Sequence, residues 1–443
     1  MSVDQDGRTE LPTGERTDDA AALLALVRTR QAITRRELGL RLRLGRKALT
    51  PLVTALLDRG LLTEHGPGTP DGSRSGTLNG ARAGASAGGR LPRTLGFGAD
   101  AGTLLVTQFG ATGLSAAVAD LDGRLLRRHH EPHDIAAGPE PALTRAGELF
   151  DRLLSELPAG APPVWGIGVG LPGPVEFRSR PVAPPIMPGW DDYPVREHLT
   201  ARFQAPAWVD NDANVMALGE LHGGAATGQE DVVYVKIGTG IGAGLLTGGR
   251  LHRGAQGAAG DVGHVAVRSE SPVVCRCGKY DCLEALAGGA ALARDGTAAA
   301  RDGSSPFLAE RLKSRGTVTA RDVADAAHDG DTVAVELLTR SGRLVGEMLA
   351  TIVNFYNPTM IVVGGGVAAA GDLVLAAVRR TVYERSLPLA TRDLRIARSA
   401  NSVDVGLTGA ACMVTDELFA APALAHWLPA GSPAGRPGLI TAD

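Results

Sequence analysis

The chain has 443 residues, of which 44 % are hydrophobic, and a formal net charge of −3. This length predicts two or three domains with full-sized cores, and the near-neutral charge by itself points to no polyanionic partner. No run of about 18 apolar residues occurs, which excludes a membrane-spanning helix, and the polar, acidic N-terminus lacks the layout of a signal peptide. We therefore expect a cytoplasmic protein without a membrane partner, in a compartment where cysteines stay reduced.

The N-terminal region is expected to bind DNA. Residues 1–18 predict a disordered tail. Residues 19–97 predict a winged helix-turn-helix domain, because three short helical patterns precede a Gly/Ser/Arg-rich segment. That segment, residues 66–90, is expected to be a flexible loop.

Positive charge is concentrated in these helical patterns. From Arg28 to Arg59, nine basic residues stand against two acidic residues, which is the local charge that contacts with DNA phosphates require. Thr34 and Glu37 have the spacing of a capping box at the start of the second helix. A small helical dimerisation module with a solvated basic face is the alternative interpretation.

The sequence allows two start positions for the third helix. If it begins after Gly45, Pro51 lies inside it and should kink it; if Thr50 is the N-cap, Pro51 takes the first helical position. Contacts with DNA are expected from basic and hydroxyl side chains of the second and third helices, namely Arg35, Arg36, Arg46, Lys47, Thr50 and Thr54.

From about residue 95 the sequence changes to an α/β pattern. Apolar runs that end in glycines or polar residues alternate with helical patterns, and ligands of open α/β sheets bind at such strand ends. Two glycine-rich segments, GTGIGAG from Gly238 and GGG from Gly364, follow predicted strands. Backbone N–H groups can approach an anion closely there, although tight turns explain either segment alone.

A strand-to-helix junction carries the sequence Asp210-Asn211-Asp212. Asp212 is a candidate general base for a sugar hydroxyl, with Asn211 binding a neighbouring hydroxyl. The alternative is a cluster that only caps the following helix.

Three of the four cysteines, Cys275, Cys277 and Cys282, fall within eight positions, and His264 precedes them by eleven residues. Four such ligands complete a tetrahedral site that suits structural zinc. A redox pair is the alternative, but it would not need the histidine. The second ring nitrogen of His264 can also be oriented toward a ligand, and the remaining Cys412 is expected to be a buried apolar residue.

Several strings together resemble the ROK family, named for repressors, open reading frames and kinases. They are Gly263-His264, CRCGKYDCLE, NDANVMALGE, GTGIGAGL and NPTMIVVGGG, and the helix-turn-helix resembles the xylose-repressor branch. The resemblance covers residues 20–415 and implies an actin-like (ribonuclease H-like), two-lobed sugar kinase fold. The implied first lobe is 98–212 with a return of 397–416, the second lobe with the zinc site is 213–396, and a C-terminal tail is 417–443.

The resemblance also implies roles for single residues. Asp212 corresponds to the catalytic base, and the metal ligands are His264, Cys275, Cys277 and Cys282. The sugar ligands would be Gly173, Asn211, Asp212, Asp261, His264 and Glu284. The phosphate-loop candidates are Gly110, Thr112, Gly238, Thr239, Gly240, Gly364 and Gly365.

Three departures from the family pattern matter. Gln108 stands where kinases carry an aspartate in the first phosphate loop, so a partner of Mg²⁺–ATP is missing. Asp261 replaces a sugar-binding glutamate and is one methylene shorter. Asp281 replaces a glycine in the zinc loop, which we expect to be tolerated.

The sequence therefore predicts a sugar-responsive transcriptional regulator, most simply a repressor, rather than an enzyme. We expect structural zinc but no ATP or Mg²⁺, and a homodimer or homotetramer that binds operator DNA at two half-sites. A sugar must favour one arrangement of the lobes for this to regulate. One alternative is a working sugar kinase with an accessory N-terminal domain, supported by Asp212 and both glycine loops. The other is a DNA-binding protein whose sugar pocket has decayed.

Overall fold

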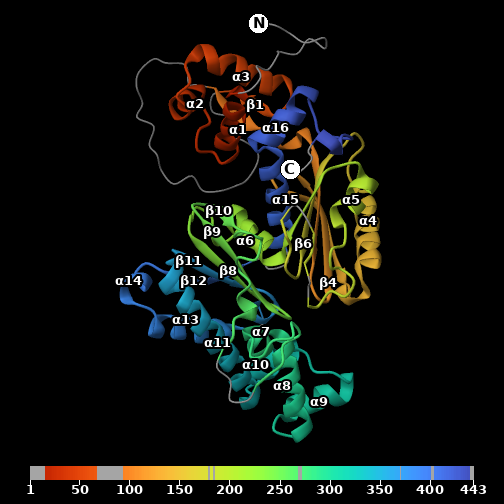
Figure 1. Cartoon of the computed structure of the whole chain (residues 1–443), viewed down its shortest axis with the longest axis vertical. Helices are drawn as coiled ribbons and strands as arrows, with labels where there is room; N and C mark the ends of the chain where they lie inside the picture. Colours follow the sequence, from red (N-terminus) through yellow and green to blue (C-terminus); the bar gives the residue numbers. More distant parts are fainter. Residues whose placement is uncertain are drawn as a thin grey trace.

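The computed structural model shows three regions in a row, an N-terminal head and two lobes that are each built on a five-stranded sheet (Figure 1). The α/β fold class predicted from the sequence is confirmed. The structure describes residues 15–66, 93–177, 180–182, 185–267, 272–369, 371–400 and 404–439.

The head begins earlier than predicted. Helix α1 (Glu15–Arg28) starts inside the segment expected to be a disordered tail, and residues 1–14 lie outside the described part. The prediction is wrong over the last residues of that segment because α1 carries apolar residues at helical spacing that bury against the rest of the head. These residues are Ala20, Leu23, Leu24 and Val27.

The helix-turn-helix consists of α2 (Arg35–Leu42) and α3 (Arg46–Asp58). The Thr34–Glu37 capping box is present at the start of α2. Helix α3 adopts the first of the two expected starts, with Pro51 inside the helix. Burial of its apolar face, which comprises Leu49, Leu52, Val53, Ala55 and Leu56, offsets the backbone hydrogen bond that proline cannot donate.

A two-stranded antiparallel sheet completes the head. Strand β1 (Leu62–His65) pairs with β2 (Thr94–Phe97) in the register Leu62↔Phe97 to His65↔Thr94. Residues 67–92 connect these strands and lie outside the described residues, so nearly all of the flexible loop predicted for 66–90 does too.

The first lobe is a mixed sheet with helices on both faces. Its strand order is β5-β4-β3-β6-β7, in which β3 pairs with β6 and β6 with β7 in parallel, whereas β4 pairs antiparallel with both β3 and β5. Helix α4 packs on β4 and α5 on β7, while α15 packs on β3 and β6. The bounds are β3 (Thr103–Phe109), β4 (Gly113–Asp120), β5 (Leu125–Pro132), β6 (Val164–Leu171), β7 (Ala207–Asn211), α4 (Pro139–Ser155), α5 (Val195–Phe203) and α15 (Val405–Leu418).

The second lobe has the strand order β10-β9-β8-β11-β12, with α6 packed on β8 and β9. The strands are β8 (Val232–Ile237), β9 (Ile241–Thr247), β10 (Arg250–His252), β11 (Met360–Gly364) and β12 (Arg395–Arg398). The helices are α6 (Asp212–Gly223), α7 (Leu283–Ala287), α8 (Gly289–Asp302), α9 (Pro306–Arg315), α10 (Ala320–His328), α11 (Thr332–Tyr356), α12 (Gly366–Ala369), α13 (Asp372–Arg385) and α14 (Pro388–Thr391). Short 3₁₀ helices lie at Ala99–Ala101, Ile135–Ala137, Val262–His264, Leu428–Ala430 and Pro437–Leu439.

The segment after residue 417 is not the loose tail that its Ala- and Pro-rich sequence predicted. Helix α16 (Ala421–Trp427) packs on α1 of the head. The Trp427 ring is fully buried, with its centroid 5.3 Å from that of Trp165 and 5.6 Å from that of Phe419. Phe419 in turn contacts Phe97 of β2 at 5.4 Å between centroids. Aromatic contacts between distant segments, invisible in the local sequence, order this end of the chain.

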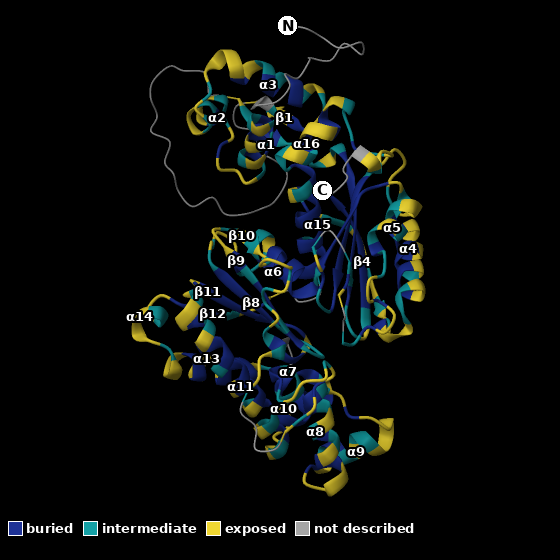
Figure 2. Ribbon diagram, in the orientation of Figure 1, coloured by how far each residue is buried: buried dark blue, intermediate teal, exposed yellow. Residues whose placement is uncertain are grey.

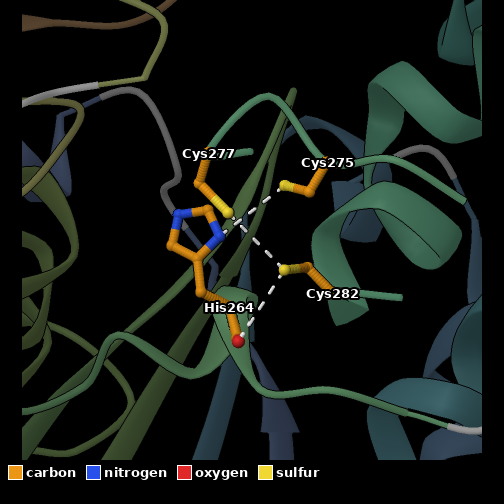
Figure 3. Close-up of side chains that lie close together, drawn as sticks. All are labelled: His264, Cys275, Cys277 and Cys282. Carbon is orange, nitrogen blue, oxygen red and sulfur yellow. Dashed lines mark hydrogen bonds between the residues drawn. The ribbon is translucent and has the colours of Figure 1, made fainter. Parts of the chain in front are cut away.

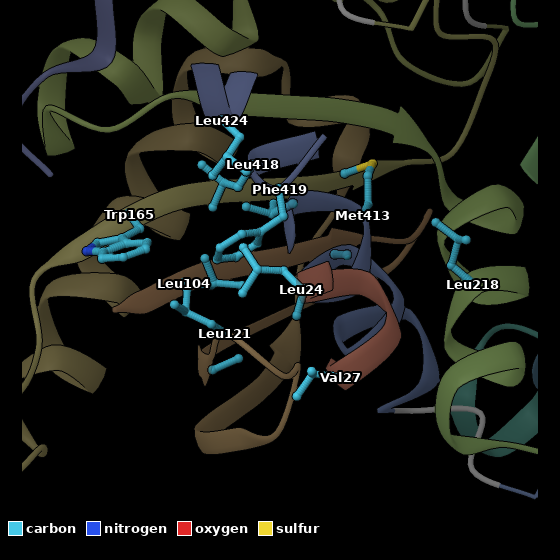
Figure 4. Packing of buried hydrophobic residues seen from close by; sticks show 14 of the residues in the cluster. Leu24, Val27, Leu104, Leu121, Trp165, Leu218, Met413, Leu418, Phe419 and Leu424 are labelled. Atoms are coloured by element: carbon cyan, nitrogen blue, oxygen red, sulfur yellow. The ribbon is translucent and has the colours of Figure 1, made fainter. Parts of the chain in front are cut away.

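One hydrophobic cluster joins the head to the first lobe. It contains Leu24 and Val27 of α1 together with Leu104 of β3, Leu121 after β4 and Leu424 of α16 (Figure 4). The same cluster extends to α6 in the second lobe. The head therefore docks on the body through core-like packing rather than through a linker alone.

Burial follows this layered arrangement. The central strands of both five-stranded sheets are buried, whereas exposed residues lie on the edge strands β5 and β10 and on the outer faces of α3, α4, α9 and α14 (Figure 2). No helix among the described residues is long and apolar enough to cross a membrane.

Candidate functional site

A cavity opens between the lobes, at the carboxyl ends of β7 and β8. It is walled by the junction of β7 with α6, the β8–β9 turn and the loop that leads to His264. All six residues predicted as sugar ligands line this one cavity. They are Gly173, Asn211, Asp212, Asp261, His264 and Glu284.

Asn211 fixes one wall by capping α6. Its Oδ1 accepts hydrogen bonds from the backbone N–H groups of Ala213 at 2.9 Å and Asn214 at 3.4 Å. Its Nδ2 donates to the carbonyl of Gly173 at 2.9 Å. Asn211 is therefore a helix cap, as the alternative interpretation held, and it also ties the Gly173 loop to α6 at the cavity edge.

Asp212, the first residue of α6, is buried and paired with a cation. The Nζ of Lys236 on β8 forms an ion pair with its carboxylate, and both residues line the cavity. The sequence analysis missed this pair, although Lys236 is one of only four lysines in the chain. The carboxylate of Asp212 therefore already has a charged hydrogen-bond partner inside the cavity.

A second buried ion pair, between Asp210 and Arg253, lies at the end of β7 next to the first. Asp210 is 1 % exposed and receives hydrogen bonds from Arg253 Nε at 2.7 Å and Asn214 Nδ2 at 2.8 Å. The guanidinium of Arg253 stacks on the Phe177 ring at 3.5 Å from its centroid. Because each charge is compensated, the β7–α6 junction can carry two acidic residues on either side of Asn211 without a large desolvation cost.

The β8–β9 turn brings Glu284 of α7 close to the backbone. The N–H of Gly238 donates to the carbonyl of Gly240 at 2.9 Å and closes the turn. Glu284 Oε2 accepts from the N–H of Ile241 at 3.1 Å. A Cβ on Gly240 would lie 2.0 Å from this oxygen, so glycine is required there for the carboxylate to approach. Gly240 and its neighbour Thr239 line the cavity.

The other phosphate-loop candidates lie outside the residues that line the cavity. A Cβ on Gly364 would lie 2.1 Å from the Tyr234 hydroxyl, and one on Gly365, whose φ is +91°, would lie 2.5 Å from the Ile237 carbonyl. Close packing against β8 therefore accounts for both. Gly110 and Thr112 flank Ala111, which does reach the cavity.

Gln108, which replaces the kinase aspartate in the resemblance, lies on β3 beside α15. A Cβ on Gly406, in the first turn of α15, would be 1.6 Å from Gln108 Oε1. The amide thus packs against this helix end, where only glycine leaves room for it.

The four predicted metal ligands form one cluster (Figure 3). The ligand atoms of His264, Cys275, Cys277 and Cys282 all lie within 4.8 Å of one another. His264 Nδ1 is 3.7 Å from Cys275 Sγ, and the Sγ atoms of Cys277 and Cys282 are also 3.7 Å apart. Bonds of about 2.3 Å to zinc give tetrahedral edges of about 3.8 Å. The cluster therefore has the composition and dimensions of a tetrahedral metal site.

Backbone bonds hold the loop that carries the cysteines. The Cys275 N–H donates to the Lys279 carbonyl at 2.7 Å, and the Gly278 N–H donates to the Cys275 carbonyl at 2.9 Å. Asp281 adopts the left-handed region, with φ of +57°, which explains the family's glycine there. Its Oδ1 accepts from the N–H of Val273 at 2.8 Å, a local bond that makes this conformation accessible to aspartate.

The three thiols differ in acidity. Burial raises the pKa of Cys275 and raises that of Cys282 to about 12. Burial also acts to raise the pKa of Cys277, but the Lys279 amide and the neighbouring thiols outweigh it and leave this pKa below its usual value. Metal binding at this cluster must therefore displace protons from at least two cysteines.

His264 connects the cluster with the cavity. Its Nδ1 faces Cys275, while its Nε2 is 3.9 Å from Asp261 Oδ1, which also lines the cavity. A metal bound at Nδ1 would fix the ring with Nε2 toward the cavity. Asp261 lies too far for a hydrogen bond in this arrangement.

The predicted DNA contacts separate into two groups. Arg46, Lys47 and Thr50 at the start of α3 are exposed, as is Arg36 of α2, while Thr54 is half-buried. Arg35 instead forms an ion pair with Glu64 of β1 at 3.3 Å. Arg93 contacts the same carboxylate at 2.8 Å, and this hydrogen bond lowers the pKa of Glu64. Arg35 therefore helps to hold the two-stranded sheet against α2.

Comparison with known proteins identifies the family. The model of the ROK family matches residues 105–417, more than two thirds of the chain. The chain belongs to the ROK family. A glucokinase from Halalkalibacterium halodurans is 31 % identical over 310 residues, which cover 70 % of this chain and 93 % of that protein. The xylose repressor of Caldicellulosiruptor bescii is 26 % identical over 402 residues, which cover 90 % of this chain and 96 % of that protein.

Solved structures of a ROK regulator and a ROK kinase likewise differ in how much of this chain they align with. A ROK family transcriptional regulator described as a homologue of the Escherichia coli Mlc protein aligns with 94 % of this chain and 99 % of its own, with a TM-score of 0.75. At 24 % identity this likeness concerns the fold. A ROK family glucokinase from Streptomyces griseus, in complex with glucose and AMPPNP, is 28 % identical and aligns with 71 % of this chain, with a TM-score of 0.61. The family model begins at residue 105, after the head.

Proposed function

We propose that this ROK protein is a sugar-responsive, DNA-binding transcriptional repressor. The observation that carries the proposal is the head, a helix-turn-helix with a paired strand wing that lies outside the family model. The xylose repressor relative extends over 90 % of the chain, whereas the glucokinase relative extends over 70 %. A head of this kind adds DNA recognition to a sugar-binding body.

The start of α3 is the proposed reading surface. Arg46, Lys47 and Thr50 are exposed there, and residues at the N-terminal end of a recognition helix contact base edges in the major groove. Arg36 on α2 would contact the phosphate backbone. As a homodimer or homotetramer, the protein would place two such helices on the half-sites of an operator.

The cavity is the proposed sugar site. Glu284, Asp261 and His264 offer hydroxyl partners on one side, and the Asn211–Asp212 junction offers them on the other. Structural zinc at the Cys₃His cluster would hold His264 in place without an open coordination position for catalysis. The effector class that fits this set of short polar side chains is an uncharged sugar or sugar derivative.

Phosphoryl transfer is disfavoured at two points. The carboxylate of Asp212 is paired with Lys236, whereas a general base must be free to contact the sugar hydroxyl. Gln108 offers no carboxylate for Mg²⁺–ATP. We therefore propose that ATP and Mg²⁺ play no part in the function.

Packed helices of the core connect the cavity with the head. Helix α6 begins at Asp212 in the cavity and crosses α15 at very short range, because a Cβ on Gly409 would lie 1.6 Å from the Val215 carbonyl. Helix α15 continues to Asp416, which forms an ion pair with Arg28 of the head. A sugar that prefers one arrangement of the lobes can therefore shift the head through packed helices.

The test is fluorescence anisotropy on a duplex from immediately upstream of the protein's own gene, with a scrambled duplex at the same stated salt. Specific binding that shifts on addition of D-xylose or D-glucose is expected. The double substitution Arg46→Ala, Lys47→Ala should reduce the salt slope by up to about 2, whereas Arg321→Ala, on an exposed face of α10 in the second lobe, should leave it unchanged. Equal binding of both duplexes by the wild type would contradict the proposal.

A sugar kinase remains the second candidate, because Asp212, Thr239 and Gly240 still line one cavity. A coupled assay for ATP-dependent phosphorylation of D-glucose and D-xylose separates it from the first. We expect no turnover above the protein-free control.

A further inference from the structure

Two loops from different lobes meet at the cavity. Residues 173–177 follow β6 and form what we call the first-lobe loop, and residues 253–261 follow β10 and form the second-lobe loop. Both loops contribute to the wall of the cavity, the first through Gly173 and Pro174 and the second through residues 257–261. A contact between the loops therefore bears on how the two lobes enclose this space.

Arg253 is the side chain that joins the two lobes here. Its Nε donates to Asp210 Oδ2 at 2.7 Å, and its guanidinium lies over the Phe177 ring at 3.5 Å from the centroid. Asp210 belongs to β7 and Phe177 to the first-lobe loop, whereas Arg253 belongs to the second lobe. A carboxylate thus holds the edge of the guanidinium and an aromatic ring holds its face, which are the two contacts that arginine makes best.

The ion pair matters because Asp210 is almost completely buried. Its side chain is 1 % exposed, against 22 % for Arg253. The second carboxylate oxygen, Oδ1, accepts from the N–H of Asn211 at 2.7 Å and from Asn214 Nδ2 at 2.8 Å. Both of these donors are neutral and adjoin Asp210 in the chain, so they would stay with it if the lobes moved apart. Arg253 would not, and a buried carboxylate without its cation is strongly disfavoured.

Each loop is fastened within its own part of the molecule. The Ala259 N–H donates to the Arg253 carbonyl at 3.1 Å and closes the second-lobe loop into a compact turn. The first-lobe loop is held by Asn211, whose Nδ2 donates to the Gly173 carbonyl at 2.9 Å. Movement of Arg253 therefore carries the cavity-lining part of the second-lobe loop with it.

The backbones of the loops also come close together, at Gly257. A Cβ on this residue would lie 2.5 Å from the Val175 carbonyl oxygen and 3.5 Å from the backbone nitrogen of Phe177. Its φ is +83°, in the region that glycine adopts most readily. Glycine at this position therefore lets the second-lobe loop lie directly on the first-lobe loop.

We propose that Arg253 is a latch that holds the two lobes together at the cavity. It is not among the described residues that line the cavity, so it is a positioning residue that acts through the second-lobe loop and not a sugar ligand. The latched arrangement is the one that a bound sugar favours, and loss of the latch lowers its population. The latch itself rests on the contacts above, whereas its effect on sugar and DNA rests on the proposed function.

Hydrogen–deuterium exchange of the full chain, without sugar or DNA, tests the latch. In Arg253→Met we expect the amides of both loops to exchange at least about 10-fold faster than in the wild type, because a charge-assisted hydrogen bond and a stacking contact are lost together. Arg253→Lys keeps the charge but loses the planar group, so its exchange should lie between the two. Faster exchange in both loops of Arg253→Met supports the inference.

Arg315→Met is the matched control. It takes an arginine away from Asp322, a carboxylate that is also nearly buried at 2 % exposure, but both residues belong to the second lobe. Exchange in both loops should stay at the wild-type rate in this variant. Unchanged exchange in Arg253→Met, or faster exchange confined to the second-lobe loop, would overturn the latch, because Arg253 would then have no effect across the cavity.

Thermal unfolding shows whether Arg253→Met still folds. If it does not, the same comparison is made with the double variant Arg253→Met, Asp210→Asn, which leaves no buried charge unpaired. Phe177→Leu removes only the stacked ring and should speed exchange in both loops to a smaller extent. Wild-type exchange in both of these proteins would overturn the latch as well.

The operator assay gives a separate result. Arg253→Met should need at least about 10-fold more D-xylose or D-glucose for the half-maximal shift in anisotropy, because less of it is in the latched state. Its sugar-free affinity for the operator should differ from that of the wild type in the direction opposite to the effect of sugar. An unchanged sugar requirement would overturn the role of the latch in the response. A wild type that binds no operator would overturn the proposed function, and exchange would still decide the latch.

Discussion

The two ends of the cavity differ in what surrounds their polar groups. At one end, Glu284 and His264 are held by a glycine turn and by the Cys₃His cluster. At the other, the carboxylate of Asp212 forms an ion pair with Lys236 of β8. The first end keeps what a hydroxyl needs, namely polar groups in fixed positions. The second end has a base whose carboxylate is already engaged.

This difference indicates how a kinase-like body can serve regulation. Phosphoryl transfer needs a free base and a bound metal–nucleotide, whereas a sensor needs only a sugar that binds one state better than another. A protein can therefore lose the free base and the metal–nucleotide site and still keep state-dependent sugar binding. The predictions below test whether the two ends separate in this way, from the largest expected effect to the smallest.

The largest effect should come from Cys277→Ser, which removes one of the four ligands at the proposed sugar end. Three remaining ligands hold zinc at least about 10–100-fold more weakly, and His264 loses its fixed orientation. We expect metal content, measured by plasma mass spectrometry, to fall from about one ion per chain to a small fraction. Stabilisation by D-glucose or D-xylose in thermal unfolding should disappear with it.

Cys412→Ser is the control for that experiment. Cys412 is a buried cysteine on α15, outside the cluster, so this variant should lose some stability but keep its metal. If the metal-free Cys277 variant kept its full response to sugar, the sugar end would not depend on the cluster.

The second prediction concerns the ion pair at the other end. Lys236→Met leaves the buried Asp212 carboxylate without its cation, which costs about 2 kcal/mol for a pair that is partly reached by solvent. The thermal midpoint should fall by about 2 °C, because the unfolding entropy of a 443-residue chain is large. Adding Asp212→Asn should restore part of the loss, because the uncompensated charge is then gone.

Lys236→Arg is the matched variant. It keeps the positive charge, so its thermal midpoint should fall much less than that of Lys236→Met. Circular dichroism on the wild type, the single variants Lys236→Met and Asp212→Asn, and the double variant completes the cycle. Strictly additive losses in the double variant would mean that Lys236 and Asp212 act independently.

Third, Glu284→Gln should weaken sugar binding about 10–100-fold, because a charged hydrogen-bond acceptor becomes a neutral one at the sugar end. Glutamine keeps the size of the side chain and can still accept from the N–H of Ile241, so the turn should remain intact. Isothermal titration with the sugar that shifts the anisotropy measures the change. The same substitution at Glu336, exposed on α11, should have no effect.

Much of the site could be predicted from the sequence because its determinants are local. The cysteine spacing after His264 indicated a four-ligand cluster, and the polar residues after β7 indicated a junction at the end of a strand. Those residues do meet in one cluster and one cavity. Asn211 shows that two local interpretations can hold together, since its side chain caps α6 and its residue also lines the cavity.

The features that escaped prediction depend on tertiary contacts. The pair of Lys236 with Asp212 depends on which face of β8 a side chain occupies and on how α6 lies beside it. The docking of α16 depends on the contact of Trp427 with Trp165, which lies far away in the sequence. The start of α3 at Arg46, with Pro51 inside, is one of the two starts that the sequence left open. Burial of the apolar face of α3 decides between them, because it outweighs the cost of an interior proline.

The smallest effect should come from Thr239→Ala. Thr239 lies in the β8–β9 turn, three residues after Lys236. The shape of this turn rests on backbone bonds, such as that from the Ala290 N–H to the Thr239 carbonyl at 3.0 Å, and the substitution leaves them in place. We therefore expect the sugar affinity, measured by the same titration, to change less than about 2-fold, well inside the effect of one lost hydrogen bond. A loss as large as that of Glu284→Gln would mean that the Thr239 hydroxyl itself contacts the sugar.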